Sequence, residues 1–268
     1  MSVMPFPNFQ NQVRAVEDFF NKEVRKHPSF LLNDRRPTNF LLPSEDYARQ
    51  LLGDWDRGWN ILDIGCGDAV DSISLAATTN KVWAIDVARS RIDLARDNVE
   101  RAGLSDRVFP EVMDVHMLDF PDEHFDLVVG NSVLLFLDRG KFAKECFRVL
   151  KPGGTALFPN ESMKKHPLLL ARRMLPGIRD RESIADRLTL RDIDLFLKYF
   201  AEVEHKQFYL FSVAFALLAG QIGKVSVFRA VLRSTYRIDD IVIRRCKRLR
   251  DYCWISVIRL RKAGTQNI

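Results

Sequence analysis

Between residues 60 and 160, short apolar runs alternate with amphipathic stretches, and this pattern predicts alternating strands and helices. The expected strands cover residues 60–64, 81–86, 108–113, 125–130 and 155–159, and the expected helices cover residues 69–77, 89–102 and 140–150. Because strands joined by helical crossovers run parallel, the pattern predicts an α/β fold with a mostly parallel sheet. In such a sheet, ligands bind outside the carboxyl ends of the strands.

The flanking segments predict helical additions and two further strands. Residues 9–27 carry apolar side chains on one side of a helical pattern, and Ser44 is a suitable N-cap for a second helix. Thr189 and Asp192 have the spacing of a capping box at the start of a later helix. Two further apolar segments suit the sixth and seventh strands, namely residues 203–211 and 254–260.

A glycine turn follows the first expected strand and indicates where a ligand binds. Gly65 and Gly67 allow a tight turn and a close approach of the backbone to a ligand, and a helix begins directly afterwards. A strand, a glycine turn and a helix form the start of a nucleotide-binding α/β domain. A dinucleotide fingerprint requires Gly or Ala three residues after Gly67, where this chain has Val70. The turn therefore favours a different nucleotide ligand.

Two acidic residues narrow the choice of ligand. Asp63 precedes Gly65 by two residues, where a carboxylate would repel a pyrophosphate and would suit a ligand that carries positive charge. Asp86 follows Gly67 by 19 residues and ends the second apolar run. An acid at about this spacing accepts hydrogen bonds from ribose hydroxyls. The alternative interpretation is that both are ordinary loop acids of an α/β protein.

The segment Asp63-Ile64-Gly65-Cys66-Gly67 resembles the first motif of class I S-adenosylmethionine-dependent methyltransferases. Residues 84–87 resemble the second motif, and residues 112–115 and 118–129 resemble the third and fourth. Residues 147–154 resemble the segment before the fifth strand. The resemblance covers about 100 residues. One departure is Ala69, where many members of the family have a third glycine.

The resemblance implies a Rossmann-like, doubly wound and mostly parallel seven-stranded sheet, with an antiparallel last strand and helical additions. It implies S-adenosylmethionine as the cofactor, with Asp114 accepting from the adenine amine and Asn131 near the sulfonium. The implied cofactor-binding residues are Asp63, Gly65, Cys66, Gly67, Asp86, Val87, Asp114, Val115 and Asn131.

Three regions of one compact unit are expected from the same resemblance. Residues 1–58 form an N-terminal helical cap, and residues 59–160 form the cofactor-binding core. Residues 161–268 hold a substrate lid, the last two strands and an amphipathic helical insertion. Within this scheme, residues 158–200 are expected to line the substrate side, and residues 158–179, with the N-terminal helices, are expected to form a lid over a mostly apolar pocket.

The catalytic residues stay unassigned, because methyl transfer from a sulfonium mostly needs positioning of the reactants. Four side chains are candidates for a role near the acceptor, namely His116, Asn131, Glu161 and His166. Glu161 follows Phe158 by three residues, and Phe158 stands where some small-molecule methyltransferases have a glutamate. For each histidine, the alternative is a solvated loop residue.

Composition sets the broad class of the protein. Apolar residues make up 47% and charged residues 28% of the chain, as in soluble globular proteins. The four cysteines form no Cys-x-x-Cys pair, which argues against a zinc site or a disulfide framework. We therefore expect no metal and a reducing compartment. Residues 1–12 lack the features of a signal peptide, so a cytoplasmic location is expected, with peripheral attachment to the inner membrane face as an extension.

The C-terminal region combines an apolar run with a basic stretch. Residues 207–223 carry no charge but are too short to span a bilayer. Residues 233–262 hold ten Lys or Arg and three Asp, a net charge of +7 in a chain of +6. Apolar residues recur at helical spacing among them, namely Ile238, Ile241, Val242, Cys246 and Leu249. The pattern predicts that residues 213–250 form helices lying on an anionic membrane, with some basic residues paired to Asp239, Asp240 and Asp251. Nucleic acid and a plain solvated face stay open as alternatives.

The sequence thus predicts a methyltransferase that uses S-adenosylmethionine on a small, hydrophobic or lipid-like acceptor, at a membrane surface. The alternatives are an RNA methyltransferase and a protein that uses the cofactor for a non-methylating reaction. Against nucleic acid, Asn131-Ser132-Val133-Leu134 lacks the Asn/Asp-Pro-Pro-aromatic sequence that holds a planar amine. The acceptor, the methylated atom and the oligomeric state are left open by the sequence.

Overall fold

A computed structural model describes residues 9–26, 42–53, 58–76, 79–169, 185–212, 214–215 and 225–264. Parts of the expected lid (170–179) and of the expected C-terminal insertion (213 and 216–224) lie outside the described residues.

Seven strands form one sheet in the order β3-β2-β1-β4-β5-β7-β6. The strands are β1 (Asn60–Ile64), β2 (Lys81–Asp86), β3 (Val108–Val112), β4 (Phe125–Val129), β5 (Leu150–Ser162), β6 (Glu202–Phe208) and β7 (Ile255–Arg261). Neighbouring strands from β3 to β5 pair in parallel, whereas β7 pairs antiparallel with both β5 and β6. The predicted fold class is confirmed, including the insertion of the last strand beside the fifth.

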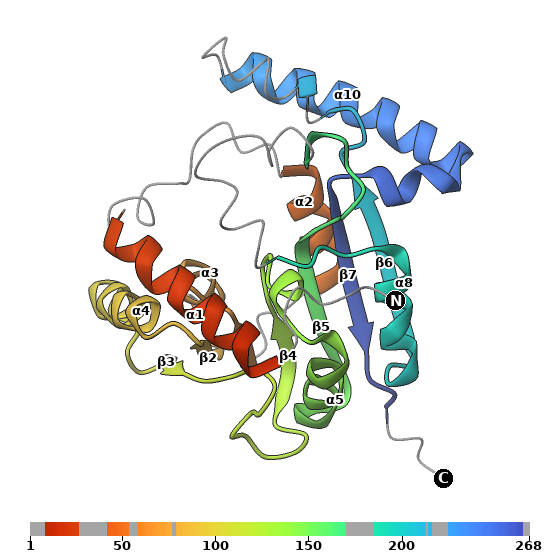
Figure 1. The fold of residues 1–268 in the computed structure, drawn as a ribbon. Coiled ribbons are helices and arrows are strands. Elements are labelled where there is room, and N and C mark those ends of the chain that lie inside the picture. The colour runs from red at the N-terminus through yellow and green to blue at the C-terminus, as the bar shows by residue number, and fades with distance from the viewer. Residues whose placement is uncertain are drawn as a thin grey trace.

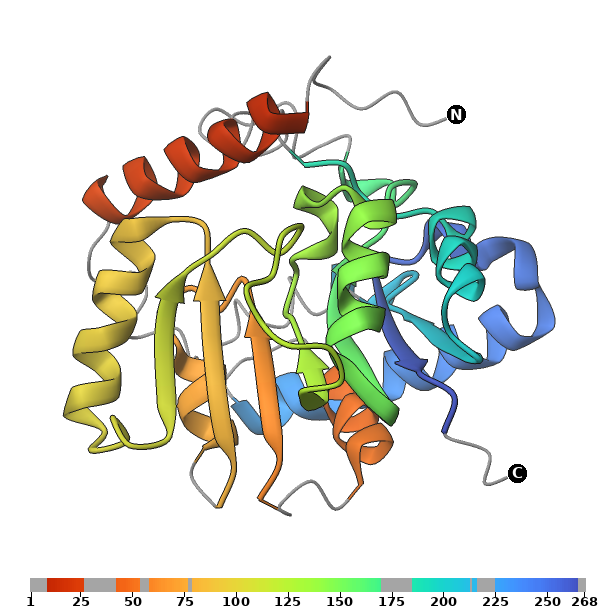
Figure 2. The same ribbon diagram turned by 90° about the horizontal axis from the view of Figure 1, so that it is seen from below.

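Helices cover both faces of the sheet (Figures 1 and 2). They are α1 (Phe9–Lys26), α2 (Leu42–Leu52), α3 (Val70–Leu75), α4 (Arg89–Arg101), α5 (Arg139–Val149), α8 (Leu190–Asp194) and α10 (Val225–Arg245). Short 3-10 helices add η1 (Leu134–Phe136), η2 (Leu195–Lys198) and η3 (Lys247–Tyr252). Figure 2 shows α1 lying across the end of the sheet at which β2 and β3 finish.

The core is divided by the sheet, because successive strand residues point to opposite faces. In β1, Leu62 and Ile64 pack with α1 and α5, while Ile61 packs on the other face with α2 and α10. All three side chains are buried. A strand buried on both faces explains why residues 61, 62 and 64 are all large aliphatic residues.

Most helix ends follow the sequence signals. The carboxylate of Asp138 accepts from the amides of Gly140 and Lys141 at the start of α5. The capping box of Thr189 and Asp192 is present at the start of α8. Gly103 has φ 67 just after α4, as expected of a helix C-terminal glycine.

The predicted N-cap role of Ser44 is wrong. Helix α2 begins at Leu42, because Pro43 has the fixed φ that suits a first helical turn. Ser44 therefore lies inside the helix, fully buried, and its hydroxyl donates to Oδ1 of Asn160 on β5 at 2.9 Å. The serine fastens α2 to the sheet instead of starting the helix.

Two predicted strands differ from the observed ones by more than one residue at an end. The expected fifth strand, residues 155–159, is the middle of the longer β5, which includes Gly153 with φ 77 and a register shift against β4. The expected sixth strand ends at Phe208 instead of residue 211. Tyr209 adopts φ 64, and a left-handed residue cannot continue the pleat.

The apolar residues predicted to share one face of the basic helix do not do so. Val242 packs with Leu210 and Cys253, whereas Ile238 and Ile241 are about 60% exposed. Asp239 was expected to pair with basic residues, but it is 1% exposed and faces the protein interior. Its carboxylate accepts from backbone amides after β6, so the buried side of α10 is organised by a polar residue that apolar spacing cannot reveal.

Candidate active site

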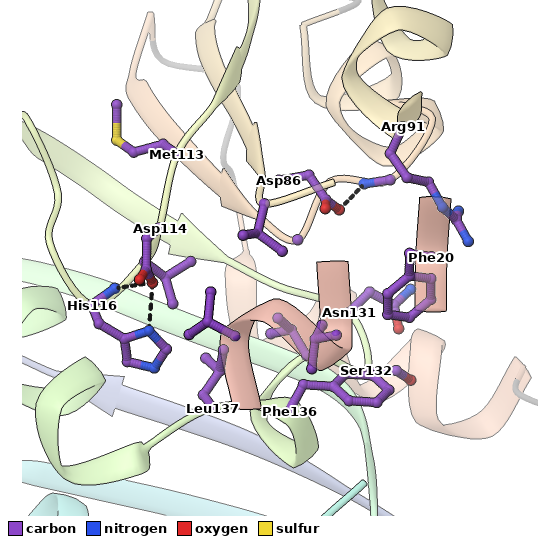
Figure 3. A pocket seen from close by; sticks show the side chains of 17 residues that line it. Phe20, Asp86, Arg91, Met113, Asp114, His116, Asn131, Ser132, Phe136 and Leu137 are labelled. Carbon is purple, nitrogen blue, oxygen red and sulfur yellow. Dashed lines mark hydrogen bonds and ion pairs between the residues drawn. The ribbon is translucent and has the colours of Figure 1, made fainter. Parts of the chain in front are cut away.

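A cavity lies at the carboxyl ends of the parallel strands, where the topology predicts it (Figure 3). Its walls come from the turns after β1, β2, β3 and β4 and from α1 and η1. The lining residues include seven of the nine predicted cofactor-binding residues, namely Gly65, Gly67, Asp86, Val87, Asp114, Val115 and Asn131. Asp63 and Cys66 do not line it.

The turn after β1 requires glycine because its backbone is left-handed and because there is no room for a Cβ atom. Gly65 has φ 62, and a Cβ added there would lie 2.7 Å from Cγ2 of Val133 in the turn after β4. Gly130 is equally confined, with Ile64 and Val133 at 2.7 Å from an added Cβ. The turns after β1 and β4 therefore approach too closely for side chains. Ala69 has φ 61 at the start of α3, which explains why glycine is common at this position in the family that the motif resembles.

Asp86 joins two backbone segments beside the cavity. Its Oδ2 accepts from the amide of Gly67 at 3.1 Å, and its Oδ1 accepts from the amide of Ala88 at 2.9 Å. Burial raises the pKa of the carboxyl, and the hydrogen bonds from Ala88 and Gly67 oppose the shift. A carboxylate can accept about four hydrogen bonds, so Asp86 retains capacity to accept from ligand hydroxyls.

Asp63 lies beneath the glycine turn. It is 3% exposed, and the hydroxyl of Ser72 donates to its Oδ2 at 2.5 Å. Burial, together with the charge of Asp71, raises the pKa of Asp63 to about 8. The acid is thus largely protonated at neutral pH in the absence of a cation. Cys66, half-buried in the same turn, has a pKa raised well above its ordinary value by burial.

Asp114 and His116 form a fixed pair on the adjacent wall, as the dashed lines in Figure 3 show. Nδ1 of His116 lies 2.5 Å from Oδ1 of Asp114, and Nε2 accepts from the amide of Asp138 at 3.1 Å. Because Nε2 accepts, Nδ1 carries the proton of the neutral ring and donates it to the carboxylate. Burial acts to raise the pKa of Asp114, but the hydrogen bonds from His116 outweigh it and lower that pKa.

The other two titratable candidates lie outside the cavity lining. Glu161 is fully buried on β5 and accepts from the amides of Val133 and Leu134 at 3.0 and 3.1 Å. Burial raises its pKa to about 7. The glutamate therefore holds the turn after β4 against β5.

His166 is 3% exposed and packs edge-on against Trp254. Its Nδ1 accepts from the amide of Leu168, and its Nε2 lies 3.3 Å from the carbonyl oxygen of Leu210. Burial lowers the pKa of the imidazole. The ring joins two segments of chain, both outside the cavity.

Asn131 lies at the exposed rim of the cavity. Its Nδ2 donates to Asp71 at 3.2 Å, and its Oδ1 accepts from Nδ2 of Asn160 at 3.3 Å. The amide is thus held between α3 and β5 with its plane fixed. This position agrees with the place expected at the end of the fourth strand.

Sequence reasoning missed an aromatic and cationic part of the wall. Phe20 of α1 lines the cavity, and the guanidinium of Arg91 lies over its ring at 5.0 Å. Phe136 contacts Phe20 edge-on at 5.4 Å. In the sequence, Phe20 is simply one residue of an apolar helical face, which gives no sign that the face covers a cavity. Among the described residues, no group of three or more His, Cys, Asp or Glu could hold a metal ion.

Comparisons with known proteins agree with this geometry. Residues 61–154 match a family model described as a methyltransferase domain. The chain is 36% identical over 103 residues to methyltransferase GfsG of Streptomyces halstedii, which is 38% of this chain and 37% of that relative. It is 31% identical over 107 residues to the ubiquinone/menaquinone biosynthesis C-methyltransferase UbiE of Geobacter sulfurreducens, covering 38% of this chain and 42% of the relative. The matches thus span less than half the length of these curated relatives.

A solved structure extends the likeness over more of the chain. The phosphoethanolamine N-methyltransferase 2 of Haemonchus contortus, in complex with S-adenosyl-L-methionine, superposes with a TM-score of 0.58 at 18% identity, covering 83% of this chain and 53% of that one. This similarity shows a shared fold. The motifs and the family match show that residues 61–154 form a methyltransferase domain that uses S-adenosylmethionine as its cofactor.

Proposed function

We propose that this protein transfers the methyl group of S-adenosylmethionine to a small, largely apolar acceptor. The observation that carries the proposal is that the acids Asp86 and Asp114 share one cavity with apolar side chains from another part of the chain. Val13, Val16 and Phe20 of α1 and Phe136 of η1 supply that apolar wall. Acids suit the polar ends of the cofactor, and the apolar wall suits an acceptor with little polar surface.

The residues present fit the cofactor. Asp86 would accept from the ribose hydroxyls, Asp114 would accept from the adenine amine, and Asn131 would lie near the sulfonium. The bare backbone at Gly65 and Gly67 leaves room for close approach, since Cβ atoms there would meet Val133 and Arg91. The cofactor supplies an electrophilic methyl group. The chain then contributes orientation and exclusion of water, which an in-line displacement chiefly needs.

The described part of the cavity wall favours a mechanism without a histidine base. Both ring nitrogens of His116 are engaged, one by the Asp114 carboxylate and the other by the Asp138 amide. Taking up a proton at Nε2 would break the bond from Asp138. His116 is therefore a positioning residue for Asp114, and the acceptor atom is nucleophilic on its own or is deprotonated by a group outside this wall.

Helix α1 is proposed to cap the cavity. The amide and hydroxyl of Ser90 at the start of α4 donate to Oδ1 of Asn21 at 3.1 and 2.6 Å. These bonds, with Arg91 over Phe20, hold the carboxyl half of α1 over the strand ends. In this scheme residues 1–58 are the cap, residues 59–160 bind the cofactor, and residues 161–268 supply the lid, the last strands and the basic helix.

A membrane surface is the proposed source of the acceptor. One relative is named for ubiquinone/menaquinone biosynthesis, which supports a lipid-like acceptor for this chain. The exposed side of α10 presents Ile238 and Ile241 beside the exposed cations Arg237, Arg244 and Arg245. Apolar and basic residues on one helical face favour an interfacial position. No helix within the described ranges is long and apolar enough to cross a bilayer.

The test is transfer of label from methyl-labelled S-adenosylmethionine into a fractionated cell extract. We expect label in the organic-solvent fraction, because the acceptor is apolar. Label only in RNA would support the RNA methyltransferase alternative. Cofactor binding with no labelled product in any fraction would instead support a non-methylating use of the cofactor.

A further inference from the structure

A second groove lies away from the cofactor cavity, between α2, β6 and α10. It is lined by Pro43, Asp46, Tyr47, Gln50, Lys206, Leu232, Arg233, Tyr236 and Arg237. None of these residues lines the cofactor cavity. The lining holds three cationic side chains and one acidic side chain, so its net charge is positive. This excess of positive charge indicates an anionic ligand.

Aromatic rings form the inner wall. Tyr236 stacks on Phe208 with ring centroids 5.4 Å apart, and Tyr47 contacts Phe208 at 5.7 Å. Nζ of Lys206 lies within 6 Å of all three ring centroids, at 5.2 Å from Tyr47, 5.4 Å from Phe208 and 5.9 Å from Tyr236. Asp240 also pairs with this ammonium at 3.3 Å. The lysine is thus held in place, and the rings offer an apolar surface beside a fixed charge.

Three donors in the groove have no ion-pair or hydrogen-bond partner within the described part of the chain, namely the guanidiniums of Arg233 and Arg237 and the hydroxyl of Tyr236. The other arginine nearby, Arg244, is paired with Asp240 at 2.8 Å. Arg233 and Arg237 are one helical turn apart on α10, so their guanidiniums can converge on one ligand. Guanidinium groups bind phosphate bidentately, and a phenol adds a neutral donor.

The groove borders the exposed apolar side of α10. At 100° per residue, Arg237 and Ile241 are neighbours one turn apart on the surface of α10. Ile238 lies beside Ile241, on the side away from Arg237. A helix with its isoleucines at the acyl boundary would therefore hold Arg233 and Arg237 at headgroup level. A lipid fits this arrangement better than a free anion does, because the exposed Ile238 and Ile241 lie next to the groove and can contact acyl chains while the groove binds the headgroup.

We propose that the groove between α2 and α10 binds the phosphate of an anionic phospholipid headgroup, with Arg233, Arg237 and Tyr236 as donors. The inference rests on the proposed membrane placement and adds a specific headgroup site to it. Diffuse attraction depends on surface charge alone. A site with donors in fixed positions, by contrast, distinguishes a phosphate from another anion of the same charge.

The experiment measures flotation of the full chain with two kinds of phosphatidylcholine vesicle. One contains phosphatidic acid and the other contains oleic acid, and both are adjusted to the same surface potential. The wild type is expected to bind the phosphate vesicles roughly tenfold more tightly, as charge-assisted hydrogen bonds to phosphate require. The double variant Arg233→Gln/Arg237→Gln is expected to bind both kinds equally, and Tyr236→Phe to lose part of the preference.

A charge-matched control is Arg245→Gln/Arg248→Gln, since both arginines are exposed and neither lines the groove. This variant should bind both vesicles more weakly and keep the preference. Equal binding of the wild type to both vesicles, or equal loss of preference in both double variants, would overturn the headgroup site.

Soluble competitors separate the two sources of phosphate. Dihexanoyl phosphatidic acid, kept below its micelle concentration, should displace the protein from phosphate vesicles at lower concentration than inorganic phosphate. Displacement by inorganic phosphate at the same concentration would contradict the lipid assignment. Cofactor calorimetry on the same variants should give unchanged affinity. If the wild type fails to bind cofactor but keeps the vesicle preference, the proposed function fails and the groove assignment stands.

Discussion

Two aspartates in different parts of the molecule accept hydrogen bonds from backbone amides, but only one of them lies beside a cavity. Asp86 accepts from Gly67 and Ala88 and lines the cofactor cavity. Asp239 accepts from the amides of Leu210, Phe211 and Ser212 and from the Ser212 hydroxyl, and it is 1% exposed. The two carboxylates therefore differ in how much hydrogen-bond acceptor capacity is left for a ligand.

This difference shows why acidic residues near backbone turns are a weak sign of function. Asp239 uses its acceptor capacity on the chain and fixes α10 to the segment after β6. Asp86 uses only part of its capacity, and the rest faces the cavity. Substitution should then affect stability at Asp239 and cofactor affinity at Asp86, and the predictions below test that separation.

The largest effect is expected for Asp239→Ala. Four hydrogen bonds to a buried carboxylate would be lost, so the free energy of unfolding should fall by about 3 kcal/mol or more. Urea denaturation measures this change. The control is Asp240→Ala at the next position, where partly exposed pairs with Lys206 and Arg244 should contribute less than about 1 kcal/mol. Equal destabilisation by both variants would contradict the assigned role of Asp239.

The next effect is expected for Asp86→Asn. The variant keeps the size of the side chain but loses the charge, so affinity for S-adenosylmethionine should fall by about 10- to 100-fold, the equivalent of about 1.5–3 kcal/mol. Calorimetry gives the affinity, and the free energy of unfolding without cofactor should fall by less than for Asp239→Ala, because only one of the two backbone amides loses its acceptor oxygen. Unchanged affinity would remove Asp86 from the ribose site.

Asp63→Asn should change how stability depends on pH. Asp63 has a pKa of about 8 in the folded chain against 3.8 for an ordinary aspartate, so the folded state holds a proton that the unfolded state has released. Wild-type stability should therefore fall as pH rises from about 4 to about 8 and level off above. The asparagine variant should lack at least about 1.4 kcal/mol of this fall, the equivalent of one pKa unit. Parallel pH profiles in urea would show that Asp63 is ionised throughout.

The smallest effect is expected for His116→Asn. Loss of the bond to Asp114 should weaken cofactor binding a few-fold, by about 1 kcal/mol, because the ring only orients the carboxylate. With saturating cofactor, the rate of methyl transfer and its pH profile should stay close to those of the wild type. Loss of about 100-fold or more in rate, together with loss of a pH-rate limb, would identify His116 as a general base instead.

The cofactor half of the molecule could be predicted from sequence because local signals there coincide. Apolar runs, helix caps and the turn glycines each depend on neighbouring residues, and motif spacing fixed the positions of Asp86 and Asp114. What could not be predicted depends on contacts between distant segments. Phe20 reaches the cavity only because α1 crosses the strand ends. The carboxylate of Glu161 accepts from backbone amides of the turn after β4 only because β5 passes next to that turn.

The C-terminal half was predicted less well, for a related reason. The sixth and seventh strands were found, since their alternation is local. The faces of α10 were assigned wrongly, because Asp239 is buried on the side that the apolar spacing assigns to polar residues, whereas Ile238 and Ile241 are exposed. A buried carboxylate satisfied by three consecutive amides is a tertiary arrangement, and helical periodicity alone assigns Asp239 to the solvent.

The most direct test of the central claim is a calorimetric titration of the wild-type chain with S-adenosylmethionine and, separately, with NAD. The cavity is lined by Asp86, next to Gly67, and by Asp114, after β3. Val70 stands where a turn that binds a pyrophosphate requires a small residue. We predict saturable binding of one S-adenosylmethionine per chain and no heat of binding for NAD. Binding of NAD with equal or higher affinity, or no binding of S-adenosylmethionine, would contradict the account.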